Sequence, residues 1–245
     1  MNTIPAVDRL AMRTRPPGSS VMHQNWENLL FLHWPIEPAS IRPLLPEELV
    51  IDTFDGKAWL GITPFALTGL RLLSLPAVPG LDSFLELNVR TYVLHRGVPG
   101  VWFFSLDASK VIPAMAARVL FSLPYFKANM DFAQNDGEFR FASKRSLSPA
   151  AAFTATWRSG LRMQAPDLES LAFFLVERYC LFAVRGRTLN TTRIYHHPWI
   201  LEEALVTSYA SSMVSALGLP EPDEPPLAHF SRFLNVEIWP PTAEA

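Results

Sequence analysis

Four side chains that could bind a ligand or move a proton alternate along residues 84–92. Because successive side chains of a strand point to opposite faces, Glu86, Asn88, Arg90 and Tyr92 would share one face of this strand. A carboxyl beside a guanidinium can hold a polar or anionic ligand between acceptor and donor groups. In a partly dry pocket the same carboxyl would become a usable acid or base near neutral pH, because burial disfavours its charged form. An ordinary sheet with one face in water shows the same alternation, so both interpretations stay open.

A second group of chemically capable residues follows Pro124. Tyr125 and Lys127 are two residues apart and would point to the same side of an extended segment. A tyrosine hydroxyl can donate to a ligand oxygen, and a desolvated lysine amine can act as a nucleophile. The structural alternatives are a packed tyrosine and a strand-edge lysine in water. Arg118 lies on the preceding predicted helix, where it could pair with the strand or point to solvent.

The order of elements in this region resembles the core of the acetoacetate decarboxylase-like superfamily. Residues 84–130 favour a strand hairpin, a helix and a strand that opens on Leu-Pro-Tyr. Residues 44–52, Leu-Leu-Pro-Glu-Glu-Leu-Val-Ile-Asp, fit the pattern typical of the superfamily. Within it the chain is similar to the YqjF-like bacterial proteins of unknown function, with Glu-Arg-Tyr at 177–179 and His-Pro-Trp at 197–199 as the points of likeness.

The resemblance implies roles for two of these residues and argues against one reaction. In the superfamily the matching strand carries a glutamate that projects into the active cavity, and Glu86 occupies that place. The matching proline is followed in acetoacetate decarboxylases by two lysines, of which the first forms a Schiff base and the second lowers the pKa of the first. Here those positions are Tyr125 and Phe126. Acetoacetate decarboxylase activity is therefore not expected.

The elements that must position these residues indicate an α+β fold. Tight turns join most neighbouring strands, so we expect a mainly antiparallel sheet, curled or closed into a barrel around a central cavity, with a few peripheral helices. The predicted helices include residues 114–122, 168–179 and 211–217, and residues 67–81 are predicted to form a long loop. Residues 1–22 are predicted to be a flexible N-terminal arm, and residues 23–245 a single acetoacetate decarboxylase-like domain.

Composition narrows the class of partner. The chain has 245 residues, a formal net charge of −2 and 21 dispersed basic residues, which argues against a nucleic-acid footprint or a basic membrane patch. No apolar stretch is long enough to span a membrane. The single cysteine, Cys180, fits a reducing compartment, and we expect a cytoplasmic protein. His196 and His197 would point to opposite faces of a strand, so no metal is predicted, and no nucleotide fingerprint suggests a cofactor.

Two classes of function follow. The first is a protein that binds or senses an apolar or carbonyl-containing metabolite, with Glu86 and Arg90 fixing its orientation and Asn88, Tyr92 and Arg118 as further ligand-binding candidates. The second is an enzyme with lyase or hydratase-like acid/base chemistry on a small keto acid, using Glu86, Tyr125 and Lys127 as catalytic residues. We favour the binding function because no complete set of nucleophile, base and orienting group is present. A homo-oligomer stays open.

Overall fold

The computed structural model describes residues 7–72, 80, 82–110 and 120–244, and strands make up most of them. The strands are β1 (Met22–Ile36), β2 (Val50–Ile51), β3 (Ala58–Leu72), β4 (Phe84–His95), β5 (Val98–Ala108), β6 (Tyr125–Asn135), β7 (Glu138–Arg145), β8 (Ala152–Arg162), β9 (Cys180–Arg185), β10 (Thr188–Tyr195), β11 (Glu202–Ser211), β12 (Leu227–Ile238) and β13 (Thr242–Ala243). The helices are α1 (Pro38–Ile41) and α3 (Leu171–Val176), with the 3-10 turns η1 (Arg42–Leu44) and η2 (Ser215–Leu217).

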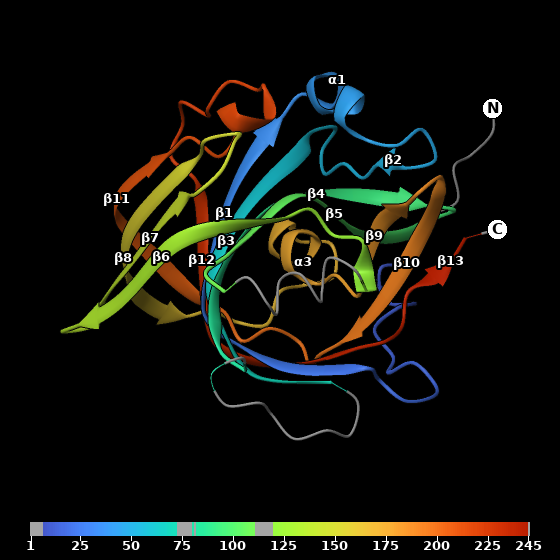
Figure 1. Ribbon diagram of the computed structural model, residues 1–245, viewed down its shortest axis with the longest axis horizontal. Coiled ribbons are helices and arrows are strands. Elements are labelled where there is room, and N and C mark those ends of the chain that lie inside the picture. Colours follow the sequence, from blue (N-terminus) through green and yellow to red (C-terminus); the bar gives the residue numbers. More distant parts are fainter. Residues whose placement is uncertain (1–6, 73–79, 81, 111–119, 245) are drawn as a thin grey trace.

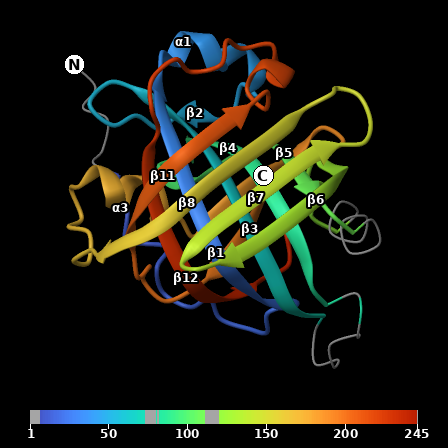
Figure 2. The ribbon, with the colours of Figure 1, turned by 90° about the vertical axis from the view of Figure 1, so that its left-hand side faces the viewer.

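The single sheet forms two closed rings of strands, and the two rings share one wall. The strand order is β13-β10-β9-β5-β6-β7-β8-β11-β12-β1-β3-β4-β2, with additional pairings of β5 with β4 and of β10 with β12. Nine strands, β5-β6-β7-β8-β11-β12-β1-β3-β4, therefore form a closed ring. The strands β9 and β10 close a second, smaller ring against β5, β4, β3, β1 and β12. In Figure 1 α3 overlaps the middle of this smaller ring, and Figure 2 places it at one edge of the barrel, beyond the strands. Figure 2 also shows β6, β7, β8 and β11 in front of the shared wall.

Successive side chains of the shared strands point to opposite faces of the wall, so these strands contribute to two separate cores. In β1, Leu29 and Phe31 pack in the core that also holds α3, whereas Leu30, Leu32 and Trp34 pack in the core of the nine-strand ring. A strand that is buried on both faces reads as an almost continuous apolar run, and residues 29–34 have this character. The two faces of one wall thus stabilise both rings.

The antiparallel sheet is confirmed, but the α+β label is not. Two pairings are parallel, β5 with β6 and β5 with β9, and the others are antiparallel. In the described part of the chain the α-helices have only four and six residues. The predicted helix at 168–179 is reduced to Leu171–Val176, and that at 211–217 to a 3-10 turn. Most of the predicted helix at 114–122 lies outside the described residues.

One further correction and one irregularity concern strands. Residues 67–72, which were predicted to begin a loop, continue β3 because they pair with β1 and β4. In β5 a bulge at Phe104 shifts the register, since Val89 pairs with Ser105 and Arg90 with Phe103. The bulge separates side chains that strict alternation would have put on one face, so Phe103 lines the pocket and Ser105 does not.

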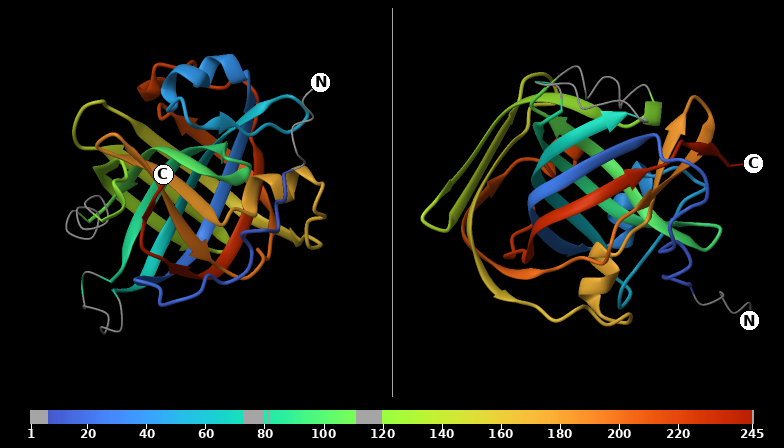
Figure 3. Two further views of the ribbon diagram at one scale, coloured as in Figure 1. Left: turned by 90° about the vertical axis from the view of Figure 1, so that its right-hand side faces the viewer. Right: turned by 90° about the horizontal axis from the view of Figure 1, so that it is seen from below.

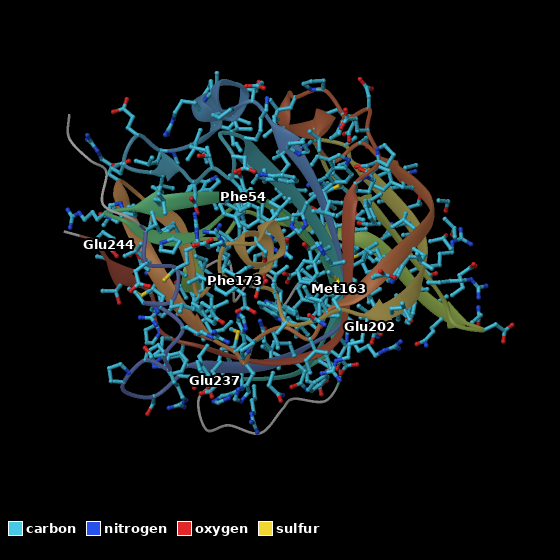
Figure 4. All side chains as sticks on the ribbon, turned by 180° about the vertical axis from the view of Figure 1, so that it is seen from behind. Phe54, Met163, Phe173, Glu202, Glu237 and Glu244 are labelled. Carbon is cyan, nitrogen blue, oxygen red and sulfur yellow. The ribbon has the colours of Figure 1, made fainter. Side chains whose placement is uncertain are left out.

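The side chains of the two cores fill most of the interior. Figure 4 shows all side chains from behind and labels Phe173 on α3. The segment before β1 follows the outside of the barrel past α3 (Figure 3). Its Arg9 pairs with Asp52, and Arg193 donates to the carbonyls of Met12 and Thr14. The domain boundary at residue 22 stays a prediction.

Candidate functional site

A pocket of about 80 Å³ lies inside the smaller ring. Its walls are mainly apolar and include Trp26, Phe84, Phe103, Phe121 and Trp199. The polar or titratable side chains among its lining residues are Gln24, Glu86, Arg90, Tyr125, Arg178 and His196. A site of this volume has room for a few water molecules or for a ligand with few heavy atoms.

Glu86 and Tyr125 form the central polar contact of this pocket. The Tyr125 hydroxyl donates a hydrogen bond of 3.0 Å to Glu86 Oε2. Glu86 is 4% exposed, and its burial raises its pKa to about 8, against the opposing effect of the Tyr125 hydrogen bond and with a smaller contribution from Asp107. Burial and the neighbouring Glu86 also raise the pKa of Tyr125 well above its usual range. At neutral pH both groups are therefore mostly protonated, and both can donate.

The sheet register brings these two residues together. Asn88 pairs with Leu106 on β5, and Leu106 pairs with Tyr125 in the short parallel contact between β5 and β6. Glu86 is two residues from Asn88 on the same face of β4, which places it within reach of the Tyr125 side chain. The pairing of β5 with β6 has only three residue pairs, and it positions the hydroxyl.

Arg90 lines the same pocket without a carboxylate partner in the described part of the chain. Its guanidinium lies 5.5 Å from the Phe31 ring and 5.7 Å from the Tyr92 ring. One Nη2 contact of 3.4 Å reaches the carbonyl of Leu175, and Nε is buried without a partner. Its long stem packs close to Gly61 on β3. Arg90 is thus a buried cation held by rings and one carbonyl.

A second buried guanidinium, that of Arg178, was missed in the sequence. Its Nη1 pairs with Asp52 at 2.6 Å and its Nε donates to the carbonyl of Phe174 at 2.8 Å, whereas Nη2 is buried without a partner. Burial lowers the pKa of Arg178, although Asp52 opposes this. The residue follows the C-cap of α3, Glu177, and lines the pocket. A charged pair, Glu177 and Arg178, directly after an apolar run was the sequence signal that could have indicated it.

The remaining predicted ligand-binding residues lie beside the pocket or outside the described chain. Tyr92 is fully buried and shares a hydrogen bond of 2.7 Å with His33 Nε2, so it supports the wall behind Arg90. Asn88 is 5% exposed, and its Oδ1 has no partner. Neither residue lines the pocket. Arg118 lies outside the described residues.

Lys127 is not brought to the pocket. Its side chain is exposed, because β6 leaves β5 after the three-residue contact and continues toward β7 on the outside. All four lysines of the chain are in the described part, and none lines the pocket. The geometry therefore offers no amine for a Schiff base at this site.

The described residues contain no group of three His, Cys, Asp or Glu side chains placed to hold a metal ion. None of their helices has both the length and the apolar character needed to cross a membrane.

Comparison with protein families identifies a matching model over most of the chain. The model of DUF2071, described as an uncharacterized conserved protein, matches residues 23–235. The chain is also 39% identical over 225 residues to the uncharacterized protein YqjF of Bacillus subtilis (strain 168), covering 92% of this chain and 93% of that protein. The predicted YqjF-like resemblance is confirmed.

Solved structures share the fold at low sequence identity. An acetoacetate decarboxylase-like enzyme from Sphingomonas wittichii RW1 has a TM-score of 0.64 and 14% identity over 96% of this chain and 98% of its own. Acetoacetate decarboxylase from Legionella pneumophila has a TM-score of 0.60 and 12% identity over 98% and 94% of the two chains. The enduracididine biosynthesis enzyme MppR, complexed with a condensation product of pyruvate and imidazole 4-carboxaldehyde, has a TM-score of 0.65 and 12% identity over 92% and 90%. The acetoacetate decarboxylase-like architecture is thereby confirmed.

Proposed function

The chain belongs to the DUF2071 family of uncharacterized conserved proteins, and we propose that it binds a small apolar or carbonyl-containing metabolite in the pocket of its smaller ring. Apolar walls supply most of the contact area, and Glu86 and Tyr125 supply directed hydrogen bonds. Arg90 fixes the orientation of the ligand from another part of the wall.

The observation that carries this proposal is the hydrogen bond between the buried Glu86 and the half-buried Tyr125. A carboxylic acid with a pKa of about 8 keeps its proton at neutral pH, so one oxygen can accept from Tyr125 while the other donates to a ligand. A ligand carbonyl oxygen fits such a donor, because a hydrogen bond inside an apolar pocket is stronger than the same bond in water. The site thus selects for a carbonyl over a purely apolar group.

An acid/base enzyme acting on a small keto acid is the second candidate function. It is favoured by the same raised pKa of Glu86, which permits proton exchange close to neutral pH. The structural neighbour MppR has been solved with pyruvate bound, which makes small keto acids the first compounds to test. Acetoacetate decarboxylase activity is not part of this proposal, because Tyr125 stands at the Schiff-base position and Lys127 is exposed.

The binding function is tested by native mass spectrometry of gently purified protein, together with a thermal-shift screen of carbonyl compounds. We expect a small molecule that co-purifies or raises the melting temperature, and a weaker effect in Glu86→Gln and Tyr125→Phe. Glu169→Gln, on the exposed surface, is the matched control and should behave like the wild type. If no ligand is found by either method, the proposal fails.

The enzymatic alternative has a separate readout. Exchange of the α-protons of pyruvate or 2-oxobutyrate with deuterated water can be followed by NMR in the presence of the protein. Catalysed exchange that is lost in Glu86→Gln supports acid/base chemistry. Exchange at the rate of the buffer alone leaves the site as a binding site.

A further inference from the structure

We propose that the ligand of this pocket is an apolar monocarboxylic acid, whose carboxylate is held between the guanidinium groups of Arg90 and Arg178. This inference rests on the proposed binding function and specifies its ligand class. It adds Arg178, with Asp52 as its positioning residue, to the site.

The first argument is the number of unpartnered donors. Arg90 is 8% exposed and Arg178 is 5% exposed, and each has a buried nitrogen without a hydrogen-bond partner. A buried N–H group without an acceptor is costly, and one on a charged group more so. Both residues line one pocket, so an acceptor group bound there would lie close to two guanidinium groups that are not fully partnered. A carboxylate accepts from two guanidinium groups at once.

The second argument is the closeness of the two cations. Their contacts converge on the end of α3, since Arg178 Nε reaches the carbonyl of Phe174 and Arg90 Nη2 that of Leu175. Both guanidinium groups also lie near the Tyr92 ring, at 4.9 Å for Arg178 and 5.7 Å for Arg90. Successive carbonyls and a shared ring keep the two side chains in one small region.

The third argument is charge. Asp52 pairs with Arg178 at 2.6 Å but also with Arg9 at 2.7 Å, so one carboxylate serves two arginines. The neighbouring Glu177 is occupied by the Tyr179 hydroxyl and the Trp199 amide. In the described part of the chain, Arg9, Arg90 and Arg178 thus have one carboxylate partner between them, Asp52. An anionic ligand group would supply a second partner, and buried charges require such pairing.

The fourth argument is the apolar remainder of the pocket. Besides the two arginines, its other polar lining residues are Gln24, Glu86, Tyr125 and His196, and most of the lining is apolar, including Met22, Leu70, Phe121, Leu123 and Ile238. Few partners are therefore available for a second charged group or for several hydroxyl groups. We expect the non-carboxylate part of the ligand to be a short branched chain or a single ring.

The test compares acids with their neutral isosteres. Isovalerate and phenylacetate are titrated into the full-length protein by isothermal calorimetry, alongside isovaleramide and phenylacetamide. Because loss of a charge-assisted contact weakens binding by about tenfold or more, we expect each acid to bind at least that much more tightly than its amide. Arg90→Gln should weaken the binding of the acids by about tenfold or more and so remove this preference.

Two variants serve as controls for loss of the folded structure. Arg90→Lys keeps the charge and should retain part of the preference for acids, and Arg232→Gln, in an exposed pair with Glu202, should retain all of it. Arg178→Gln is made together with Asp52→Asn, so that no unpaired buried carboxylate is left. This double variant should also lose the preference.

The experiments distinguish an incorrect carboxylate site from a pocket that binds no ligand. Equal affinity for acids and amides, or an unchanged preference in Arg90→Gln, overturns the carboxylate site while the pocket still binds ligands. No binding of either acid at millimolar concentration also overturns it. A neutral compound recovered by native mass spectrometry would support the binding function and contradict the inference at the same time.

Discussion

At the scale of the residue, Glu86 combines a titratable group with nearly complete burial, and its chemistry follows from that combination. The charged form would lose its hydration in an apolar pocket, so the neutral form is favoured and the pKa rises to about 8. Tyr125 compensates only in part, since one hydrogen bond opposes the desolvation. The result is an acid that can donate at neutral pH yet still release its proton under mildly alkaline conditions.

The first prediction concerns Glu86→Gln and pH. The folded-state pKa of about 8 lies above the ordinary value of 4.5, so the folded protein binds more protons than the unfolded chain between these values. The contribution of Glu86 to stability is therefore present at low pH and is lost as pH rises toward 8. Glu86→Gln removes this loss, so its free energy of unfolding should rise relative to the wild type by about 3–5 kcal/mol between about pH 5 and pH 8.

Urea unfolding of both proteins at the two pH values measures this difference. The control is Glu169→Gln, since an exposed carboxyl should show little change with pH relative to the wild type. A constant difference between Glu86→Gln and the wild type would mean that the carboxyl titrates as if it were in water.

The second prediction concerns the lysines. Incubation with pyruvate followed by borohydride reduction should add no mass to the protein, because no lysine lines the pocket and so none is desolvated there as a Schiff-base amine would need to be. Intact-protein mass spectrometry checks this. Reductive methylation with formaldehyde, which labels exposed amines, shows that the lysines are accessible. A pyruvate adduct mapped to Lys127 would contradict the structure described above.

At the scale of the element, the sequence predicts strands well where both neighbours are close in the chain. The hairpin of β4 and β5 was predicted, and so was the side of β4 that carries Glu86, because a period of two is unambiguous there. The bulge at Phe104 was not predicted, since it depends on how β5 meets β4 rather than on local composition. The sequence analysis did not predict the strand β11, because its main partner β8 is distant in the chain and a register shift between Val206 and Ser208 interrupts its alternation.

The contacts of the candidate site could also be predicted only where the residues are close in the chain. Glu86 and Arg90 share one strand, so their common face could be predicted from spacing. The contact of Glu86 with Tyr125 could be expected only from the resemblance to a known fold, since 39 residues separate them. Arg178 and Asp52 are 126 residues apart, and no local pattern joins them.

The third prediction concerns the junction of β5 with β9, where the smaller ring closes. A Cβ atom at Gly100 would lie 2.5 Å from Phe182 Cε2 and 2.9 Å from the carbonyl oxygen of Cys180. Backbone cannot yield easily at a strand pairing, so Gly100→Ala should lower the free energy of unfolding by about 3 kcal/mol. Urea denaturation measures the loss.

Gly61→Ala is the matched comparison, since both glycines are buried in strands. Its added Cβ would lie 3.2 Å from His33 and 3.3 Å from Arg90, which are side chains rather than backbone. We expect it to cost less than Gly100→Ala. The reverse order would show that the contact between β5 and β9 is looser than described.

At the scale of the whole molecule, the shared wall joins the two rings into one structure. The strands β1, β3 and β4 are buried on both faces, so neither ring can unfold without exposing the core of the other. The pocket lies in the smaller ring, where buried polar groups interrupt the apolar core. The nine-strand ring, with a core that includes Phe139, Phe141 and Trp157, supports that wall from behind.

The last prediction concerns the segment before β1, which ties the N-terminal part of the chain to the site. Arg9, 20% exposed, donates two hydrogen bonds to the buried carboxylate of Asp52, which in turn pairs with Arg178. Burial alone would raise the pKa of Asp52, but the two arginines lower it below its ordinary value. Arg9→Gln leaves this carboxylate with one partner, so the free energy of unfolding should fall by about 1–3 kcal/mol at neutral pH.

The pH dependence and a second variant in the same segment make this prediction specific. Because the pKa of Asp52 is lowered, its stabilising contribution is present above its unfolded-state pKa of about 3.8 and is lost as pH falls through the lower folded-state value. The effect of Arg9→Gln should therefore shrink in strong acid. Arg15→Gln breaks an exposed pair with Glu237 and should cost less than Arg9→Gln, because solvent screens an exposed pair. Equal costs for the two variants would show that the segment only covers the surface, whereas a larger cost for Arg9→Gln links it through Asp52 to Arg178 and the pocket.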